Sequence, residues 1–487
     1  MDIKDETGTL AVRALTGEAV DKENSRRVLR KVDGRILPFL CITFGLQVID
    51  KMSLNYASIY GLIEDNNLQG QDFSWATSIF FFGYLVAEYP GLALLQKFPI
   101  AKFLGINQTI WGAIMMSQAA CSSFASLAAV RFILGMAEST FAPGFVAMMV
   151  IWWTREEQAA RSALWVSFLG VGSVVGTLFA YAVGHIQGSL SIWKYMFIIL
   201  GTITIVWGVV FAYFVPDNPA NVHWLDEDEK VIAVQRVISN KTGTKSRQFV
   251  KAQVFEAVTD PKVILMGLIS FSNAFAMGWA TFGSLIIHGF GFSPLQTILM
   301  TLPCCMVQLV TGLSAGLGTF YIRNSRLYIG SIAMIPPIIG TILINNLGEE
   351  DKWGRLVGFW LFGSQLVGLV ILFGILSTNI AGTTKRSIAS GWVFICYCIG
   401  QIAGPQCFKN TEAPTYRTGI VSLLSGFILN LVLNLVLRML YVLENEKRDR
   451  AMKGKSEEEI AEMRRESDIQ GFEDVTDKHN AMFRYAL

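Results

Sequence analysis

The sequence predicts an all-α polytopic membrane protein with about twelve transmembrane helices in two six-helix halves. Hydrophobic residues make up 52% of the 487-residue chain and charged residues only 16%, whereas soluble globular chains carry about 25% charged residues. Apolar runs of about 20 residues, the length that spans a bilayer as a helix, recur along the chain. The longest polar interruption, residues 216–260, leaves six such runs on either side.

Each predicted helix follows one apolar run, bounded by short segments that contain Gly, Pro, Asn or charged residues. In chain order, the twelve spans are 37–58, 73–95, 103–123, 126–152, 162–184, 195–215, 263–286, 295–319, 327–346, 355–376, 380–404 and 417–441.

These spans divide the chain into five segments. They are a polar N-terminal segment (1–35), a first six-helix half (36–215), a central loop (216–260), a second half (261–443) and a charged tail (444–487). Lys and Arg are more frequent in the loops on the side of the two termini, and such loops face the cytoplasm. We therefore expect both termini to be cytoplasmic.

The central loop contains a predicted amphipathic helix. Asp226 has the position of a helix cap, with Glu229 three residues later, in "WLDEDEKVIAVQRVI". This spacing matches a capping box, so a helix should begin after Asp226 and lie at the cytoplasmic side.

Several function classes find no support in the sequence. The seven cysteines are scattered and lack zinc-type spacing. We find no P-loop, hydrolytic nucleophile or metal-ligand cluster, so we expect neither an enzyme nor a cofactor or metal. The net charge of +2 and the absence of a basic domain argue against nucleic-acid binding.

Five charged residues fall inside the apolar runs of the first half. They are Asp50, Lys51, Glu88, Arg131 and Glu138. Because a charge at bilayer depth is costly, such residues face a protein interior or an aqueous cavity, and they mark a functional site by default.

Arg131 and Glu138 lie seven residues apart in "RFILGMAEST". That spacing is about two helical turns, roughly 10 Å, and places both on one face with Gly135 between them. The sequence therefore predicts a gap between the two charges rather than a direct ion pair.

The first span carries a polar stripe of Gln47, Lys51, Asn55 and Ser58 at helical spacing. Asp50 is turned away from Lys51 by about 100°. We expect Lys51 and Arg131 at similar depth, where two cations attract an anion and Arg suits a carboxylate. Glu138, and Asp50 as a second candidate, would carry the coupling proton.

Alternatives stay open for these residues. Asp50, Lys51, Arg131 and Glu138 can instead form a buried network that only holds two helices together. Glu88, one turn after Tyr84 and just before Pro90, fits proton binding and helix packing equally well.

The second half supplies polar candidates for the cavity wall, where ordinary hydrogen bonding between helices is the alternative for each. They are Asn273, Trp279, Gln308, Gln365, Trp392 and Gln401.

Several motifs resemble those of one transporter family. The six-plus-six arrangement resembles the major facilitator superfamily, and "RFILGMAESTFAPGF" resembles a helix signature of its anion:cation symporter branch. "DKMSLNYAS", "FFGYLVAEYPGLALLQKFPIAKFLG", "NIAGTTKRSIASG", "IAGPQCFKNTEAPTYRTG" and the ending "DVTDKHNAMFRYAL" are similar to the fungal allantoate permease group.

The resemblance implies proton-coupled uptake of a small organic anion, such as a carboxylate vitamin or ureide. It assigns proton roles to Asp50 and Glu138 and an anion role to Arg131. Lys51 departs from the arginine of the wider branch but agrees with the fungal group. Lys97, Lys102, Lys385 and Arg386 would serve in gating, although the usual aspartate is missing from the loop that contains Lys97 and Lys102.

We therefore predict a monomeric proton symporter of the plasma membrane that alternates access to a midplane site. Its partners would be a small organic anion, protons and the lipid bilayer. Two alternatives are an efflux carrier or uniporter for a small metabolite, and a transporter-like nutrient sensor that signals through residues 445–487.

Overall fold

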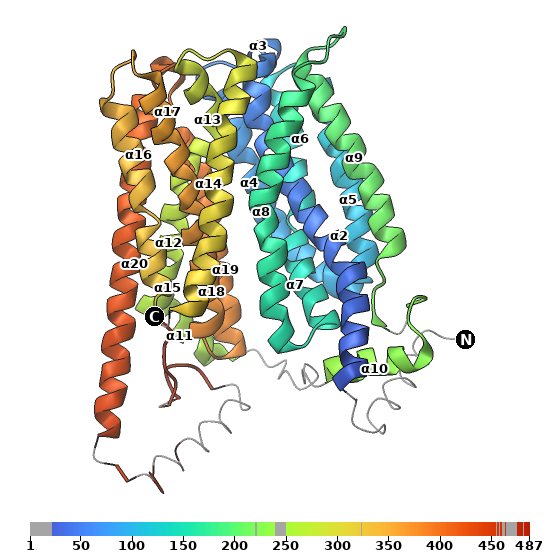
Figure 1. The fold of residues 1–487 in the computed structure, drawn as a ribbon, viewed down its shortest axis with the longest axis vertical. Helices are drawn as coiled ribbons and strands as arrows, with labels where there is room; N and C mark the ends of the chain where they lie inside the picture. The colour runs from blue at the N-terminus through green and yellow to red at the C-terminus, as the bar shows by residue number, and fades with distance from the viewer. Residues whose placement is uncertain are drawn as a thin grey trace. The chain divides into compact units, whose positions relative to one another are not determined.

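The computed structural model describes residues 22–487 apart from 220–221, 239–249, 323, 454, 457, 460–462, 464–474 and 481. Within these residues every regular element is a helix, as the sequence predicts (Figure 1). Eleven continuous helical stretches of the described chain are long and apolar enough to cross a membrane.

One of the twelve predicted spans, 103–123, is not among these eleven stretches. It corresponds to α5 (Ile100–Ser117) followed by the short turn η2 (Gln118–Ala120). Lys102, Asn107 and Gln108 lower its mean hydropathy below that of the other spans. Gln108 is fully buried and accepts a hydrogen bond from Thr43, so this helix is polar on a side that faces protein.

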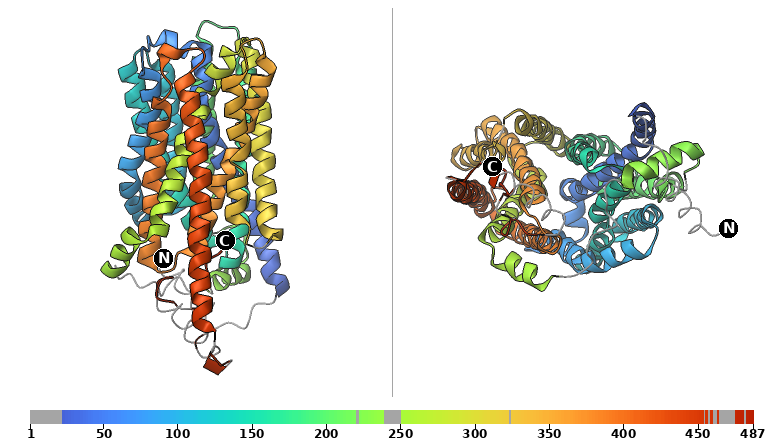
Figure 2. Two further views of the ribbon diagram at one scale, coloured as in Figure 1. Left: turned by 90° about the vertical axis from the view of Figure 1, so that its left-hand side faces the viewer. Right: turned by 90° about the horizontal axis from the view of Figure 1, so that it is seen from below.

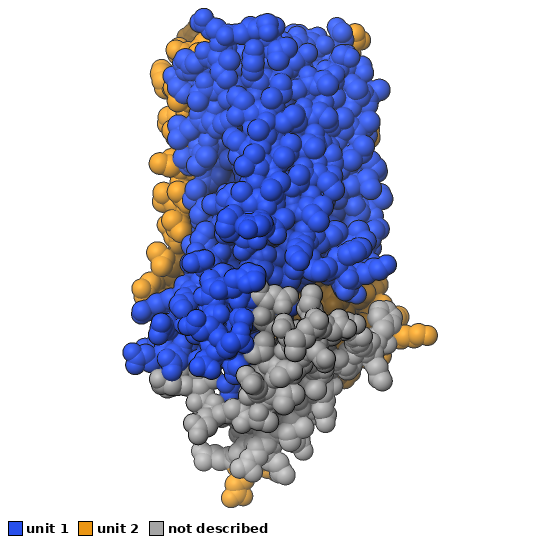
Figure 3. Space-filling view, turned by 90° about the vertical axis from the view of Figure 1, so that its right-hand side faces the viewer, with its two compact units in different colours: residues 1–68, 79–244 blue, residues 69–78, 245–487 orange. Residues whose placement is uncertain are grey.

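The chain divides into two compact units, which are coloured separately in Figure 3. Unit 1 comprises residues 1–68 and 79–244, and unit 2 comprises residues 69–78 and 245–487. The change after residue 244 lies inside the predicted central loop.

The helices of unit 1 follow the predicted runs. They are α2 (Lys22–Ala57), η1 (Ser58–Leu62), α3 (Ile63–Asp65), α4 (Asp72–Lys97, from residue 79 onward), α5, η2, α6 (Phe124–Glu138), α7 (Phe141–Trp152), α8 (Arg155–Val183), α9 (Ile192–Phe214) and α10 (Glu227–Ile238).

Glycines allow two helix pairs of unit 1 to pack backbone against backbone. A Cβ on Gly135 of α6 would lie 2.0 Å from the carbonyl oxygen of Phe80, and one on Gly83 of α4 would lie 2.0 Å from that of Phe132. Gly105 of α5 meets Ala212 of α9 in the same way. Small residues at such contacts are typical of membrane helices, because close approach maximises van der Waals contact.

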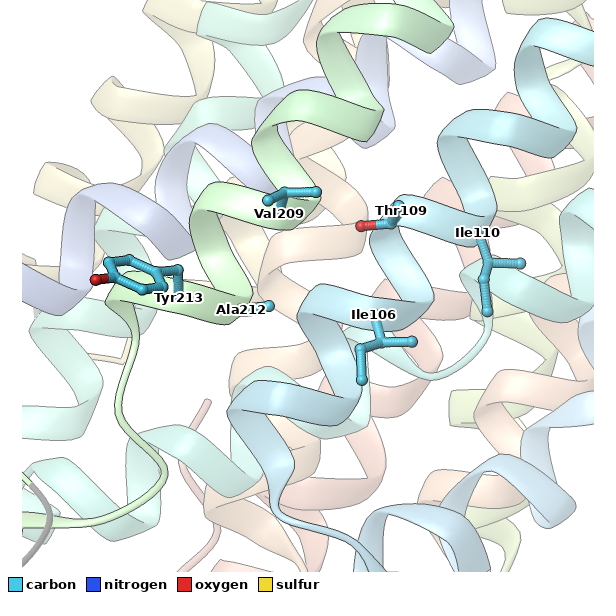
Figure 4. Close-up of a pocket in the computed structure, with 6 residues that line it drawn as sticks. All are labelled: Ile106, Thr109, Ile110, Val209, Ala212 and Tyr213. Carbon is cyan, nitrogen blue, oxygen red and sulfur yellow. The ribbon is translucent and has the colours of Figure 1, made fainter.

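The α5–α9 pair also has an open apolar groove of about 480 Å³, shown in Figure 4. Ile106, Ile110, Val209 and Tyr213 line it and are each at least half exposed. Exposed apolar side chains on spanning helices are the expected surface toward lipid.

The central loop contains α10, which begins directly after Asp226. The Asp226 backbone N–H donates to the Glu229 carboxylate at 3.2 Å, which is one of the two bonds of a capping box. The Lys31 ammonium of α2 donates a hydrogen bond to Glu229 Oε1 at 2.7 Å, and the two side chains thereby form an ion pair. This contact joins α10 to α2 within unit 1.

Three of the membrane-length stretches in unit 2 are broken. The helices of this unit are α11 (Lys251–Thr259), α12 (Pro261–Ala276), α13 (Gly278–Gly289), α14 (Pro294–Tyr321), α15 (Arg326–Ile332), α16 (Ile335–Asn346), α17 (Lys352–Trp360), η5 (Leu361–Gln365), α18 (Leu366–Asn379), α19 (Thr383–Gln406), η6 (Asn410–Glu412) and α20 (Arg417–Met452). The breaks lie at Met277, between α15 and α16, and at η5. The long α20 runs past the ends of its neighbours (Figure 2).

The core of unit 2 reaches the last residues of the chain. Ile269, Leu372, Val393 and Tyr441 belong to one buried cluster that also contains Tyr485. Glycines again permit close packing: a Cβ on Gly400 of α19 would lie 2.5 Å from the Phe271 carbonyl oxygen of α12.

Candidate functional site

Four of the predicted charged residues come together inside unit 1. Asp50 and Lys51 are neighbours on α2, and Arg131 and Glu138 lie on α6. Asp50, Arg131 and Glu138 are at most 3% exposed, whereas the Lys51 side chain is 42% exposed. Lys51 is therefore the most exposed member of the group.

The Asp50 side chain is buried in the helix bundle, unlike that of its neighbour Lys51. One of its oxygens, Oδ2, accepts a 2.6 Å hydrogen bond from the indole Nε1 of Trp111 on α5, and Trp111 is itself fully buried. Asp50 also interacts electrostatically with Arg131. Trp111 and Arg131 together hold this carboxylate in place.

Glu138 pairs with Lys51. The Lys51 ammonium lies 2.7 Å from Glu138 Oε1, and the Glu138 side chain is completely buried. Glu138 Oε2 accepts no hydrogen bond from the described residues. The pair thus joins a completely buried carboxylate to a partly exposed cation.

Aromatic rings cover both cations. The Arg131 guanidinium carbon is 5.1 Å from the ring centre of Phe80, and the Lys51 ammonium is 5.9 Å from that of Tyr84. Both rings belong to α4, which approaches α6 at Gly135. The contact at Gly135 therefore sets the spacing between the rings and the charges.

The two cations share both carboxylates. Lys51 reaches Glu138, because its long side chain spans toward the end of α6. Arg131 interacts electrostatically with Asp50 and Glu138, and Lys51 interacts with the same two carboxylates. That Lys51 and Arg131 lie at similar depth and together attract an anion stays a prediction.

The remaining residues of the predicted stripe are less accessible than Lys51. Gln47 and Asn55 are about 5% exposed or less, and Ser58 donates to the Asn55 carbonyl at 2.7 Å. Glu88 is partly buried, and its Oε2 has no hydrogen-bond partner among the described residues. Their roles in binding or coupling stay predictions.

In unit 2, two of the predicted wall residues are buried at the helix breaks. Trp279 Nε1 donates to Gln365 Oε1 at 2.5 Å, and Gln365 Nε2 donates to the Asn273 carbonyl at 2.6 Å. Asn273 and Gln365 are each 1% exposed. These bonds join α12, α13 and η5, which is the helix-to-helix role that we kept as the alternative.

Two of the other predicted residues of unit 2, Gln308 and Trp392, are more exposed, whereas Gln401 is buried. Gln308 is half-buried on α14, and Trp392 of α19 is 38% exposed, with its indole against Gly267. Gln401 donates to Tyr397 at 2.8 Å. Asn430 of α20, which sequence reasoning missed, donates to Ser272 and to the Ile269 carbonyl at 3.0 Å. Its signal was a pair of amides, Asn430 and Asn434, one turn apart in an apolar run.

The predicted gating residues of unit 1 are exposed, and neither Lys97 nor Lys102 forms an ion pair with another described residue. The segment around Lys102 does contact an aspartate, Asp217, which lies three residues after the end of α9. Its Oδ1 accepts the backbone N–H groups of Ala101 and Lys102 at 2.9 and 3.2 Å. A carboxylate therefore caps α5 from a distant part of the sequence.

Lys385 is fully buried in unit 2 and contacts three carboxylates at 2.8–2.9 Å, from Glu256, Asp260 and Asp477. Arg386 next to it is exposed and donates to the Ile380 carbonyl at 2.8 Å. The sequence pointed to Lys385 but not to its partners. Those acids lie outside the apolar runs, where charged residues are ordinary.

The fold and the charged site define a multi-pass membrane carrier. A family model described as "Major Facilitator Superfamily" matches residues 40–405, and the chain belongs to this superfamily. It is a transporter rather than an enzyme, and its relatives carry the names of transporters or permeases.

Two named relatives come from Saccharomyces cerevisiae. "Allantoate permease" is 32% identical over all of this chain and 91% of its own length, and "Thiamine pathway transporter THI73" is 34% identical over 95% and 87%. "Uncharacterized transporter C460.05" of Schizosaccharomyces pombe is 38% identical over 95% and 86%. The resemblance to the fungal allantoate permease group is thereby confirmed.

A solved bacterial homologue of the human lysosomal transporter Spinster shares the fold. Its TM-score is 0.60 at 13% identity, covering 87% of this chain and 97% of that one.

Proposed function

We propose that this transporter is a proton-coupled symporter that takes up a small organic anion, in the plasma membrane and with both termini in the cytoplasm. The observation that carries the proposal is the ion pair between the accessible Lys51 and the buried Glu138. The relatives named for allantoate and for the thiamine pathway support a small nutrient as the substrate class.

The ion pair provides a reason for coupling. When Glu138 takes up a proton, it loses its charge, and the Lys51 ammonium loses the negative charge that lay 2.7 Å away. A carboxylate of the substrate can then take the place of Glu138 beside Lys51. Proton and anion favour each other's binding, because either one alone leaves an uncompensated charge in a partly desolvated site.

Arg131 and Asp50 have a supporting part in this scheme. Arg131 lies between the two carboxylates and has the planar fork that suits a second oxygen of an anion. Asp50, fixed by Trp111, keeps Arg131 in position and balances its charge. Glu88 is a further proton candidate, because one of its buried oxygens has no partner in the described part of the chain.

The test uses proteoliposomes and a panel of labelled small carboxylates that includes allantoate. With an inward proton gradient, the wild-type protein should accumulate its substrate above the external concentration. Glu138→Gln should permit equilibration and exchange but no accumulation, because a glutamine cannot release a proton. Glu227→Gln is the matched control, since Glu227 lies on α10 of the same unit and is 71% exposed.

Accumulation by Glu138→Gln at the wild-type level would refute the assignment of Glu138. If the wild-type protein only equilibrates its substrate across the membrane, the uniporter alternative replaces the symporter.

A further inference from the structure

Residues 475–480 and 482–487, which we call the tail segment, lie against the helix ends of unit 2. They contact α11, α12, α15, α18, α19 and α20 through hydrogen bonds, ion pairs and ring stacking. Thr476, Asp477 and Tyr485 are at most 4% exposed. The segment therefore inserts three side chains into unit 2.

The backbone of the tail segment is bound by two amide side chains. Asn379 of α18 donates to the Ala486 carbonyl and accepts from the Ala486 N–H, both at 2.8 Å. Asn445 of α20 makes the same pair of bonds with Tyr485, at 2.9 and 3.0 Å. Each amide thus satisfies both the N–H and the carbonyl group of one residue of the segment, because an amide side chain has a donor and an acceptor.

Tyr485 is the aromatic anchor of the segment. Its ring stacks on Tyr441 with 4.9 Å between ring centres, and the Lys262 ammonium lies 4.2 Å from its centre. Its hydroxyl donates to Asp477 Oδ2 at 2.7 Å. Burial and the neighbouring Asp477 raise the pKa of the Tyr485 phenol, so it stays a hydrogen-bond donor at neutral pH.

Asp477 is the charged anchor. Its carboxylate lies 2.8 Å from the buried Lys385 ammonium and accepts the Ala381 N–H at 3.4 Å. Arg448 of α20 donates to the carbonyl groups of Asp477 and Phe483 at 2.8 and 2.6 Å. The segment is therefore fixed to the corner between α18 and α19 as well as to α20.

The helix ends form a site that is balanced in charge without the segment. Lys385 also contacts Glu256 and Asp260, Lys262 lies 3.8 Å from Asp260, and Arg448 lies 3.4 Å from Glu444. These three cations face three carboxylates that do not belong to the segment. Removing the segment leaves paired charges behind, so the site can exist empty.

We propose that unit 2 contains a peptide-binding site whose ligand is the tail segment, and that its occupation holds the α18–α19 corner in place. The ligand is a peptide that presents an acidic side chain and, eight residues later, a tyrosine. This proposal is independent of the transported substrate and of Glu138.

The experiment starts from the full-length chain with a protease site inserted between residues 469 and 470. After cleavage, the detached peptide should stay with the protein during gel filtration. Once it has been washed away, the melting temperature should fall, and a labelled synthetic peptide of residues 475–487 should bind saturably and restore it.

Peptide variants test the two anchors. Asp477→Asn and Tyr485→Phe peptides should bind roughly tenfold to a hundredfold more weakly. The first loses the ion pair with Lys385, and the second loses the hydrogen bond that the Lys262 ammonium donates to the Tyr485 hydroxyl. Lys478→Ala is the matched control and should bind like the original, since Lys478 is exposed.

Two results would overturn the proposal. One is a stripped protein that melts at the original temperature and does not bind the labelled peptide. The other is an equal affinity of the Asp477→Asn and the unchanged peptide. A third result would also contradict the proposal. This is aggregation of the protein after removal of the peptide, if adding the peptide back does not prevent it.

Discussion

At the scale of single residues, the site depends on the contrast between two partners of one ion pair. Glu138 is entirely buried while the Lys51 side chain is 42% exposed, so a solute can meet the cation but not the carboxylate. If these four charged residues only held α2 and α6 together, all four could be buried. The exposure of Lys51 therefore favours a binding role.

A substitution at Gly135 tests how tightly these residues are positioned. A Cβ at Gly135 would lie 2.0 Å from the Phe80 carbonyl oxygen, so Gly135→Ala should force α4 and α6 apart. We expect a loss of about 1–3 kcal/mol in the free energy of unfolding, as for other overpacked contacts, measured by thermal denaturation in detergent.

The matched control is Gly34→Ala on α2 of the same unit, where an added Cβ meets nothing within 4 Å. An alanine there should be neutral or stabilise the helix by up to about 1 kcal/mol. Equal melting temperatures of the two variants would show that α4 and α6 can move apart at Gly135 without a loss in the free energy of unfolding.

The residues that carry charge were predictable, whereas their partners were not. Asp50, Lys51, Arg131 and Glu138 stand out because each interrupts an apolar run. Trp111 is one of 12 tryptophans, and nothing in its own segment indicates that it donates to Asp50. Pairing depends on how helices rotate and cross, which a single sequence does not specify.

At the scale of elements, α10 shows what local sequence does determine. Its start after Asp226 follows from the capping pattern, which involves residues only three apart. Its attachment to α2 depends on Lys31, which is 198 residues from Glu229. The element was predictable, but its docking position was not.

The docking of α10 should depend on pH. The hydrogen bond from Lys31 holds the pKa of Glu229 below its usual value, and that usual value is about 4.3. A carboxyl with a lowered pKa stabilises the fold at pH values above its unfolded pKa. That stabilisation is lost as the pH falls through the lowered folded pKa.

Melting temperatures of wild type and Glu229→Gln from pH 7 down to pH 3 measure this effect. The variant should melt lower at pH 7, and the difference should close at the acid end. Glu227→Gln, on the exposed side of α10, should follow the wild type throughout. A constant difference between wild type and Glu229→Gln at all pH values would contradict the assignment.

At the scale of the whole molecule, the two units use different polar chemistry. Unit 1 contains the buried charges of α2 and α6, whereas unit 2 contains amides at its helix breaks and a charged cluster at its helix ends. The sequence predicted this asymmetry from the distribution of ionisable residues. It did not predict the docking of the tail segment, because Lys385 and Asp477 are 92 residues apart.

The charge balance of the site predicts the electrical behaviour of transport. Without substrate, Lys51 and Arg131 are balanced by Asp50 and Glu138. With a proton on Glu138 and a monovalent anion beside Lys51, the sum is again zero. Since both forms of the carrier are neutral at the site, symport of one proton with a monocarboxylate should move no net charge.

Proteoliposomes in which a potassium gradient and valinomycin set the membrane potential can measure this directly. Accumulation of a monocarboxylate should follow the pH gradient and change little when the potential is reversed at constant pH. A dicarboxylate that enters with the same single proton should instead be driven by an inside-positive potential, because the loaded site then has one negative charge in excess. Monocarboxylate uptake that rises steeply with an inside-negative potential would require a second proton, and Glu88→Gln should then abolish that dependence.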